Sequence, residues 1–262
     1  MPTPTILLGT VLLEAHRWGK DRSPTYRVSE WLDRIAAAGF SGIELWENHA
    51  AEVDANELAA LKKSRVPITI FNSYVTFDDE GKARRDLVAD VIRQLRPQAV
   101  KFNVSKHAER VSAELATAQS WAASFPGVKL LCECHPGTSL EDPVIAAKVL
   151  AKFPNIQAII HPFTGTDTDL WFRNHGARIS HAHVQACNPD KARARLEQVP
   201  ALVGEQLRIM HAHGYNGSWT IEFTAGVGTP PEDRDALFAA AVSDRRYLAQ
   251  AWEQRAAGTA PR

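Results

Sequence analysis

The chain has 262 residues, 45% of them hydrophobic, which is enough to bury a large core in one globular domain. Its thirty basic and thirty acidic residues cancel, so we expect no overall field that attracts nucleic acid or an anionic membrane. The first residues carry no basic segment, and the apolar run 6–13 is too short for a signal peptide or a membrane span, so we expect a cytoplasmic protein.

Short apolar runs recur along the chain and alternate with segments of helical periodicity. Between two of the runs, Val111, Leu115 and Ala118 are spaced as on one helix face. Strands that are apolar nearly throughout and alternate with helices are typical of a parallel sheet covered by helices. The predicted strands are 6–13, 42–46, 67–74, 99–105, 129–135, 156–162, 179–185 and 218–224.

Eight such strands with helical connections fit a closed α/β barrel, the (β/α)8 or TIM barrel, better than an open sheet. Neither of the glycine-rich signatures of nucleotide-binding α/β folds occurs in the sequence. No linker divides the chain, so we predict a single domain over residues 1–253. A small, polar C-terminal tail, 254–262, is expected to be flexible.

Four consecutive predicted strands carry an acid or an imidazole near the C-terminal end. In a parallel barrel, functional groups gather at the C-terminal ends of the strands. Any one of these residues could simply bond a neighbouring loop, but four together favour a divalent metal site. Alternation along the strand directs Cys132 and Cys134 away from that site, so we expect both to be reduced thiols that face the helices. The four predicted ligands are Glu133, His161, His183 and Glu222.

Other polar residues share faces or strand ends with these four. His181 lies one inward step deeper than His183, where it would support a ligand from behind. Lys101 lies between apolar neighbours, where its amine would complement a substrate or form a buried ion pair; the sequence leaves both open. The predicted substrate-binding residues are Glu44, Trp46, Lys101, Asn103, His135 and Gln185.

The chain resembles the xylose isomerase-like barrel superfamily, in particular its sugar phosphate isomerase/epimerase branch. The resemblance rests on four segments: 37–46, 132–135, 181–183 and 214–222. In such relatives, one divalent ion is held by Glu, Asp, His and Glu. Three of our four predicted ligands match this pattern, whereas His161 stands where the family usually has Asp and Thr164 where a His often follows. The resemblance therefore implies one divalent ion, and the candidates are Mn, Fe, Zn, Co and Mg.

The same resemblance implies a metal-dependent isomerase or epimerase that acts on a small-molecule sugar or keto-sugar. The metal would stabilise an enediolate, with Glu133 and Glu222 as base and acid. A metal-dependent keto-polyol dehydratase, which is a lyase, shares the intermediate and is the alternative, and a non-catalytic sugar-binding barrel is the third. An endonuclease IV-like activity is disfavoured because the additional Asp and His ligands of a trinuclear site are missing. Association into a homo-oligomer is left open.

Overall fold

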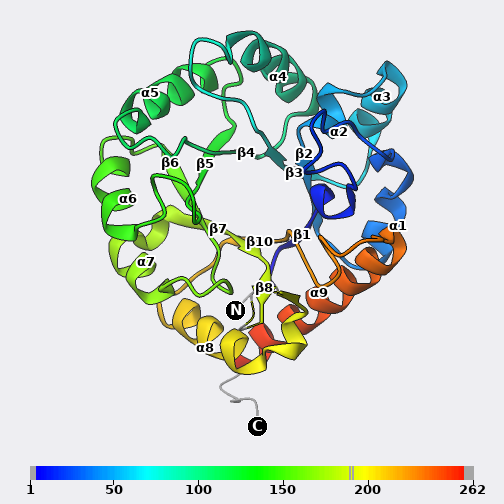
Figure 1. Cartoon of the computed structure of the whole chain (residues 1–262), viewed down its shortest axis with the longest axis vertical. Coiled ribbons are helices and arrows are strands. Elements are labelled where there is room, and N and C mark those ends of the chain that lie inside the picture. The colour runs from blue at the N-terminus through cyan, green and yellow to red at the C-terminus, as the bar shows by residue number, and fades with distance from the viewer. Residues whose placement is uncertain (1–3, 189, 191, 257–262) are drawn as a thin grey trace.

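The computed structural model describes residues 4–188, 190 and 192–256, in which eight parallel strands close into a barrel (Figure 1). Around the barrel the order is β1-β10-β7-β6-β5-β4-β3-β2, so strands adjacent in the order of the chain are also neighbours in space. This confirms the predicted (β/α)8 barrel. The strands are β1 (Ile6–Gly9), β2 (Gly42–Trp46), β3 (Ile68–Asn72), β4 (Ala99–Phe102), β5 (Lys129–Glu133), β6 (Ile156–Ile160), β7 (Ile179–Val184) and β10 (Ser218–Ile221).

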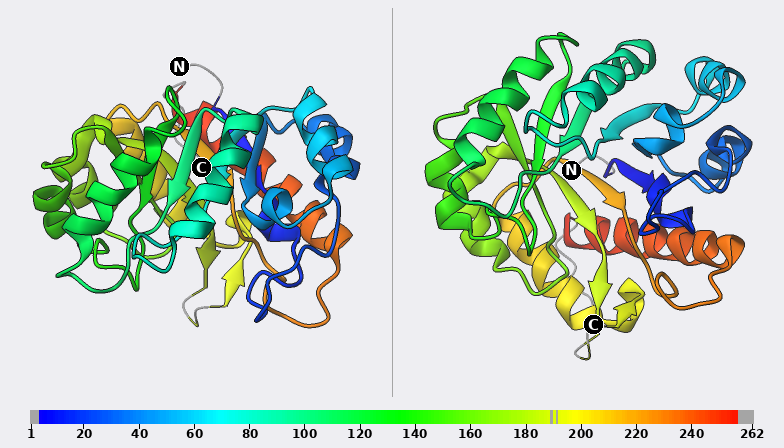
Figure 2. Two further views of the ribbon diagram at one scale, coloured as in Figure 1. Left: turned by 90° about the horizontal axis from the view of Figure 1, so that it is seen from above. Right: turned by 45° about the horizontal axis from the view of Figure 1, so that its top comes forward.

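Helices enclose the barrel on its outer side, and a short antiparallel ribbon of β8 (Ala186–Cys187) and β9 (Arg193–Ala194) follows β7. Figure 2 shows this ribbon projecting from one end of the barrel. Four 3-10 helices, η1 (Thr10–Leu13), η2 (Val28–Glu30), η3 (Gly176–Arg178) and η4 (Leu196–Gln198), join the described elements. The α-helices are α1 (Leu32–Ala37), α2 (Asn48–Ala51), α3 (Ala55–Lys63), α4 (Lys82–Leu95), α5 (Val111–Ala122), α6 (Pro143–Leu150), α7 (Thr168–His175), α8 (Pro200–Ala212) and α9 (Arg234–Ala256).

Several predicted strands extend beyond the observed ones at the C-terminal end. The run 6–13, for example, is strand only to Gly9, and Thr10–Leu13 form the 3-10 helix η1. Residues past the ladder remain buried, as Leu12 and Leu13 are, because loops and helices cover them. Apolar character therefore continues past the last inter-strand hydrogen bond, and hydrophobicity alone does not mark the strand end.

The inside of the barrel has an apolar floor beneath a polar layer. One cluster of buried apolar side chains is separate from the main core between strands and helices, and its members come from five strands. On β5 the inward positions run from Leu131 to Glu133, and on β4 from Ala99 to Lys101. The floor thus supports the polar residues above it, and it consists of Leu7, Ile70, Ala99, Leu131 and Ile159.

Cys132 and Cys134 are free thiols buried in the main core, as expected from their alternation with Glu133. Among the described residues, no helix is both long and apolar enough to cross a membrane. Of the predicted C-terminal tail, 254–256 form the end of α9, and 257–262 lie outside the described residues.

Asp244 on α9 links two loops to the barrel, because its carboxylate accepts hydrogen bonds from the Leu196 amide and the Thr224 hydroxyl. Burial raises the pKa of Asp244 from 3.8 to about 6, although these hydrogen bonds oppose the shift. In the unfolded chain the carboxyl ionises near pH 4. Between pH 4 and pH 6 the folded protein therefore loses stability as pH rises, by up to about 3 kcal/mol.

Asp244→Asn should remove this loss. The free energy of unfolding of the variant, relative to that of the unmodified protein, should rise by about 3 kcal/mol between pH 4 and pH 7. Urea denaturation at a series of pH values measures it. Asp235→Asn, an exposed carboxylate on the same helix, serves as the control and should show no such rise. Equal pH slopes for Asp244→Asn and the unmodified protein would contradict the expectation.

Candidate metal centre

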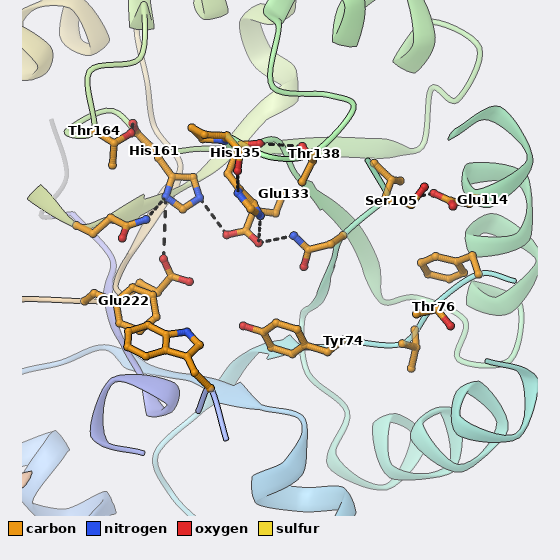
Figure 3. Close-up of a pocket in the computed structure, with 18 of the residues that line it drawn as sticks. Tyr74, Thr76, Ser105, Glu114, Glu133, His135, Thr138, His161, Thr164 and Glu222 are labelled. Atoms are coloured by element: carbon orange, nitrogen blue, oxygen red, sulfur yellow. Dashed lines mark hydrogen bonds and ion pairs between the residues drawn. The ribbon is translucent and has the colours of Figure 1, made fainter. Parts of the chain in front are cut away.

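The C-terminal ends of the strands open into a cavity of about 640 Å³. Figure 3 shows Glu133, His161 and Glu222 facing one another on one side of this cavity, with Ser105 and Glu114 on the other. The lining combines carboxylates, imidazoles and aromatic rings, and such a mixed concave surface is typical of small-molecule sites.

All four predicted ligands converge. Glu133 ends β5, His161 directly follows β6, His183 lies on β7 and Glu222 directly follows β10. One ligand atom of each lies within 4.8 Å of the others, and all four side chains are buried. Two carboxylates and two imidazoles at this spacing can bind a divalent ion.

Glu133 is the most heavily hydrogen-bonded member of the set. Its Oε1 lies 2.9 Å from His161 Nε2 and 2.9 Å from His183 Nδ1. Its Oε2 lies 2.6 Å from the Lys101 ammonium and accepts a hydrogen bond from Asn103 at 2.6 Å. Burial opposes ionisation, but the Lys101 charge and the imidazoles outweigh it and hold the pKa of Glu133 well below its usual value.

Glu222 has a different environment. Its Oε2 is buried and has no hydrogen-bond partner among the described residues. It lies 3.4 Å from His183 Nδ1 and 4.0 Å from His161 Nδ1. A buried carboxylate oxygen without a partner is costly, and a cation bound between these residues would satisfy it. The donor set therefore fits a divalent ion.

A buried hydrogen-bonded group lies behind His183. Its Nε2 is 3.1 Å from Glu44 Oε2, so Nδ1 is the nitrogen that faces Glu133 and Glu222. Burial alone would lower the pKa of His183, but the Glu222 and Glu44 carboxylates raise it well above its usual value. A divalent ion bound beside Nδ1 would supply this positive charge in place of the proton. The neutral imidazole would then ligate the ion through Nδ1.

Two solved structures resemble this chain along nearly its whole length at low sequence identity. The 3-keto-D-glucoside 4-epimerase YcjR from E. coli is 13% identical, with 94% of this chain and 99% of that one covered and a TM-score of 0.67. The IOLI protein, solved with a bound zinc atom, is 12% identical, with 95% and 99% covered and a TM-score of 0.71. No protein-family model and no curated protein matches the sequence.

A third solved structure, a xylose isomerase domain protein from Salmonella typhimurium, is 11% identical, with 95% and 98% covered and a TM-score of 0.64. The chain has the xylose isomerase-like barrel fold. The fold that the sequence resemblance implied is therefore confirmed.

Of the predicted substrate-binding residues, three line the cavity of this xylose isomerase-like barrel: Asn103, His135 and Gln185. Gln185 Nε2 lies 2.8 Å from His161 Nδ1, and His135 Nε2 lies 3.8 Å from Glu133 Oε2. All three side chains are thus close to the predicted ligands, where a bound substrate would meet them.

The other three predicted substrate-binding residues are buried and do not line the cavity. Glu44 is buried against His183, and its Oε2 also accepts a hydrogen bond from the Thr220 hydroxyl. Trp46 is fully buried and packs edge-on against His49. Lys101 is buried in its ion pair with Glu133, which is one of the two interpretations that the sequence left open. Glu44 and Lys101 thus hold His183 and Glu133 in place without lining the cavity.

His181, predicted to support a ligand from behind, lies in the same buried group as Glu44. Its Nε2 is 2.9 Å from the Thr220 hydroxyl and 3.3 Å from Glu44 Oε2, and its Nδ1 is 2.7 Å from the Ser218 hydroxyl. His181 therefore reaches His183 through Glu44, not through the cavity.

Several cavity residues were missed at the sequence level. Tyr74 directs its hydroxyl into the cavity (Figure 3) and ends a predicted strand, so its position could have been noticed. Trp18, Arg193 and Phe223 also line the cavity. Trp18 is on the loop after η1 and Arg193 on the ribbon, where no periodic pattern marks a functional residue.

Proposed function

We propose that this protein is a metal-dependent isomerase or epimerase that acts on a sugar or a keto-sugar. The convergence of Glu133, His161, His183 and Glu222 beside the cavity carries the proposal, because they meet within 4.8 Å at the mouth of the barrel. Support comes from the fold shared with a 3-keto-D-glucoside 4-epimerase and with a protein that binds zinc.

A divalent ion held by these residues would act as a Lewis acid on a substrate carbonyl. Glu222, which lines the cavity, would remove the proton beside that carbonyl. His135, at the edge of the cavity, would bind a substrate hydroxyl, and Asn103 would keep Glu133 in place through its 2.6 Å hydrogen bond.

A dehydratase acting on a keto-polyol is the second candidate, and the unequal environments of the two carboxylates favour it. An epimerase removes a proton on one face and returns it on the other, so it needs two groups that exchange protons. Here Lys101 and Asn103 both contact Oε2 of Glu133, whereas Oε2 of Glu222 accepts no hydrogen bond from the described residues and lies 3.4 Å from His183 Nδ1. One base is sufficient for dehydration, because the proton it removes can be passed to the departing β-hydroxyl, which leaves as water.

Metal analysis tests the proposal most directly. The purified protein is stripped with a chelator, supplied with Mn, Fe, Zn, Co and Mg in turn, and measured by mass spectrometry. We expect one ion per chain for at least one of these metals. The loaded protein is then incubated in D2O with ketoses and keto-polyols, and deuterium incorporation or loss of water is followed by NMR. A protein that binds none of the five ions would refute the mechanism.

His161 is the ligand that departs from the family pattern, so its variants give a separate prediction. His161→Asp restores the commoner ligand set and should retain a metal, with a shift in preference towards Mg or Mn because an oxygen replaces a nitrogen. His161→Ala should weaken metal binding at least tenfold. Thr164→Ala is the control, because Thr164 bonds only the His161 carbonyl and Thr166 and should leave metal affinity unchanged. Unchanged metal affinity in His161→Ala would show that His161 is not a ligand.

A further inference from the structure

Arg193 reaches the cavity from β9 of the ribbon that follows β7. Its guanidinium carbon lies 4.3 Å from the ring centroid of Phe223 and 5.7 Å from that of Trp18. All three side chains line the same cavity as Glu222. The aromatic rings hold the planar guanidinium in place while its hydrogen-bonding edge stays free for other partners.

The polar contact of Arg193 connects it to the candidate metal centre. Its Nη1 donates a hydrogen bond to Gln185 Oε1 at 2.5 Å, and Gln185 Nε2 lies 2.8 Å from His161 Nδ1. The guanidinium is therefore one side chain away from a predicted ligand. A group bound to Arg193 would lie close to the atoms of a substrate that reach the metal.

Arg193 makes no ion pair with a carboxylate within the described part of the chain, whereas Arg17 and Arg84 do. Arg17 pairs with Glu232 at 2.7 Å, and Arg84 pairs with Glu47 at 2.6 Å. Burial lowers the pKa of Arg193, an effect that the charge of Glu222 opposes, yet an arginine stays charged at neutral pH. A half-buried cation without a counter-ion is costly, and an anionic ligand would remove that cost.

The net charge of the candidate metal centre also favours an anionic ligand at Arg193. The centre contains three buried carboxylates, those of Glu44, Glu133 and Glu222, and one buried ammonium, that of Lys101, which pairs with Glu133. A divalent ion would bring these groups to neutrality, with both imidazoles uncharged as ligands. The charge of Arg193 is then left over, so the loaded site is cationic on the side of Trp18 and Phe223.

We propose that the substrate carries an anionic group, a carboxylate or a phosphate, and that Arg193 binds it beside the reacting carbon. This inference rests on the proposed function, since it names the substrate class of the same site. It narrows the candidates from neutral sugars to sugar acids, keto acids and sugar phosphates. Trp18 and Phe223 are then the rings that keep the guanidinium in its binding orientation.

Three matched three-carbon probes test the proposal: glycerate as the carboxylate, glycerol 3-phosphate as the phosphate and glycerol as the neutral compound. Dissociation constants are measured by NMR titration, with Zn-loaded protein and with chelator-treated protein. We expect at least one anion to bind tenfold or more tightly than glycerol, because hydrogen bonds to ionic groups are stronger than neutral ones. The anion that binds more tightly shows whether the anionic group of the substrate is a carboxylate or a phosphate.

Arg193→Gln should weaken binding of that anion at least tenfold and leave glycerol binding unchanged, whereas Arg193→Lys should retain part of the affinity because it keeps the charge. Arg110→Gln is the matched control: Arg110 also lines the cavity and directly precedes α5. It should change anion affinity less than threefold.

Equal binding of both anions and glycerol, or full anion affinity in Arg193→Gln, would overturn the proposal. A failure of the proposed function is distinguished by the metal measurement. If the protein binds no divalent ion, the chelator-treated samples still report whether Arg193 selects an anion. If the ion binds but Arg193→Gln has no effect, only the substrate class is wrong.

Discussion

Glu222→Gln is expected to reduce turnover by about 10²- to 10⁴-fold, which is the usual contribution of a positioned general base. The substitution keeps the size of the side chain and replaces a proton-accepting oxygen by an amide. Glu222 Oε2 has no hydrogen-bond partner within the described part of the chain, so the substitution removes only its charge interactions with His183 and His161. Deuterium incorporation from D2O into the substrate that the unmodified protein turns over measures the rate.

A matched control distinguishes the loss of the proposed base from the general effect of removing a buried carboxylate. Glu47 is buried at the end of β2, where it accepts a hydrogen bond from Ser73 and pairs with Arg84. It does not line the cavity, so Glu47→Gln should leave the turnover rate of the folded protein nearly unchanged. Metal content is measured on both variants. A Glu222→Gln protein that holds its ion and exchanges deuterium at the normal rate would exclude Glu222 as the base.

The fold could be predicted from the sequence because each strand and helix has a recognisable local pattern of apolar residues. Strands buried on both faces are apolar throughout, and the helices between them repeat every three or four residues. The alternation along β5 also placed Glu133 inward and Cys132 and Cys134 towards the helices, as the structure shows. The four candidate ligands followed from the rule that strand ends of a barrel carry functional groups.

Depth within the barrel could not be predicted in the same way. Glu44 and Trp46 lie near the end of β2, yet they are buried and do not line the cavity. How deep a residue lies depends on the tilt and stagger of neighbouring strands, which no single strand encodes. β2 pairs with β3 through a register shift between Ile43 and Glu44, and such an irregularity leaves no mark in hydrophobicity.

Arg193 escaped prediction for a different reason. It belongs to a ribbon of two-residue strands inserted after β7, and segments this short have no periodicity to read. Its role depends on Trp18 and Phe223, which are far away in sequence and meet it only in the folded chain. Cavity walls built from loops are therefore visible only in the structure, whereas ligands on strands can be read from the sequence.

Lys101→Met is expected to destabilise the protein by about 3–5 kcal/mol, because it leaves the buried Glu133 carboxylate without its ammonium partner. Lys101 Nζ lies 2.6 Å from Glu133 Oε2, and both side chains are almost fully buried. Burial disfavours a charge without a counter-ion at that position, and the remaining contacts of Glu133 with Asn103 and the two imidazoles do not replace the ammonium. Urea denaturation of chelator-treated protein measures the free energy of unfolding without a contribution from bound metal.

The double variant Lys101→Met/Glu133→Gln tests the cause of that loss. It removes both charges, so it should recover a large part of the stability that Lys101→Met loses, because no unpaired buried charge remains. Lys82→Met breaks an exposed ion pair with Asp86 on α4 and is the control, with an expected change below about 1 kcal/mol. If Lys101→Met costs no more than Lys82→Met, or if the double variant is as unstable as the single one, the ion pair is not what keeps Glu133 ionised in the barrel. Glu133 would then remain free to exchange protons, and the argument for a single free base in this site would fall with it.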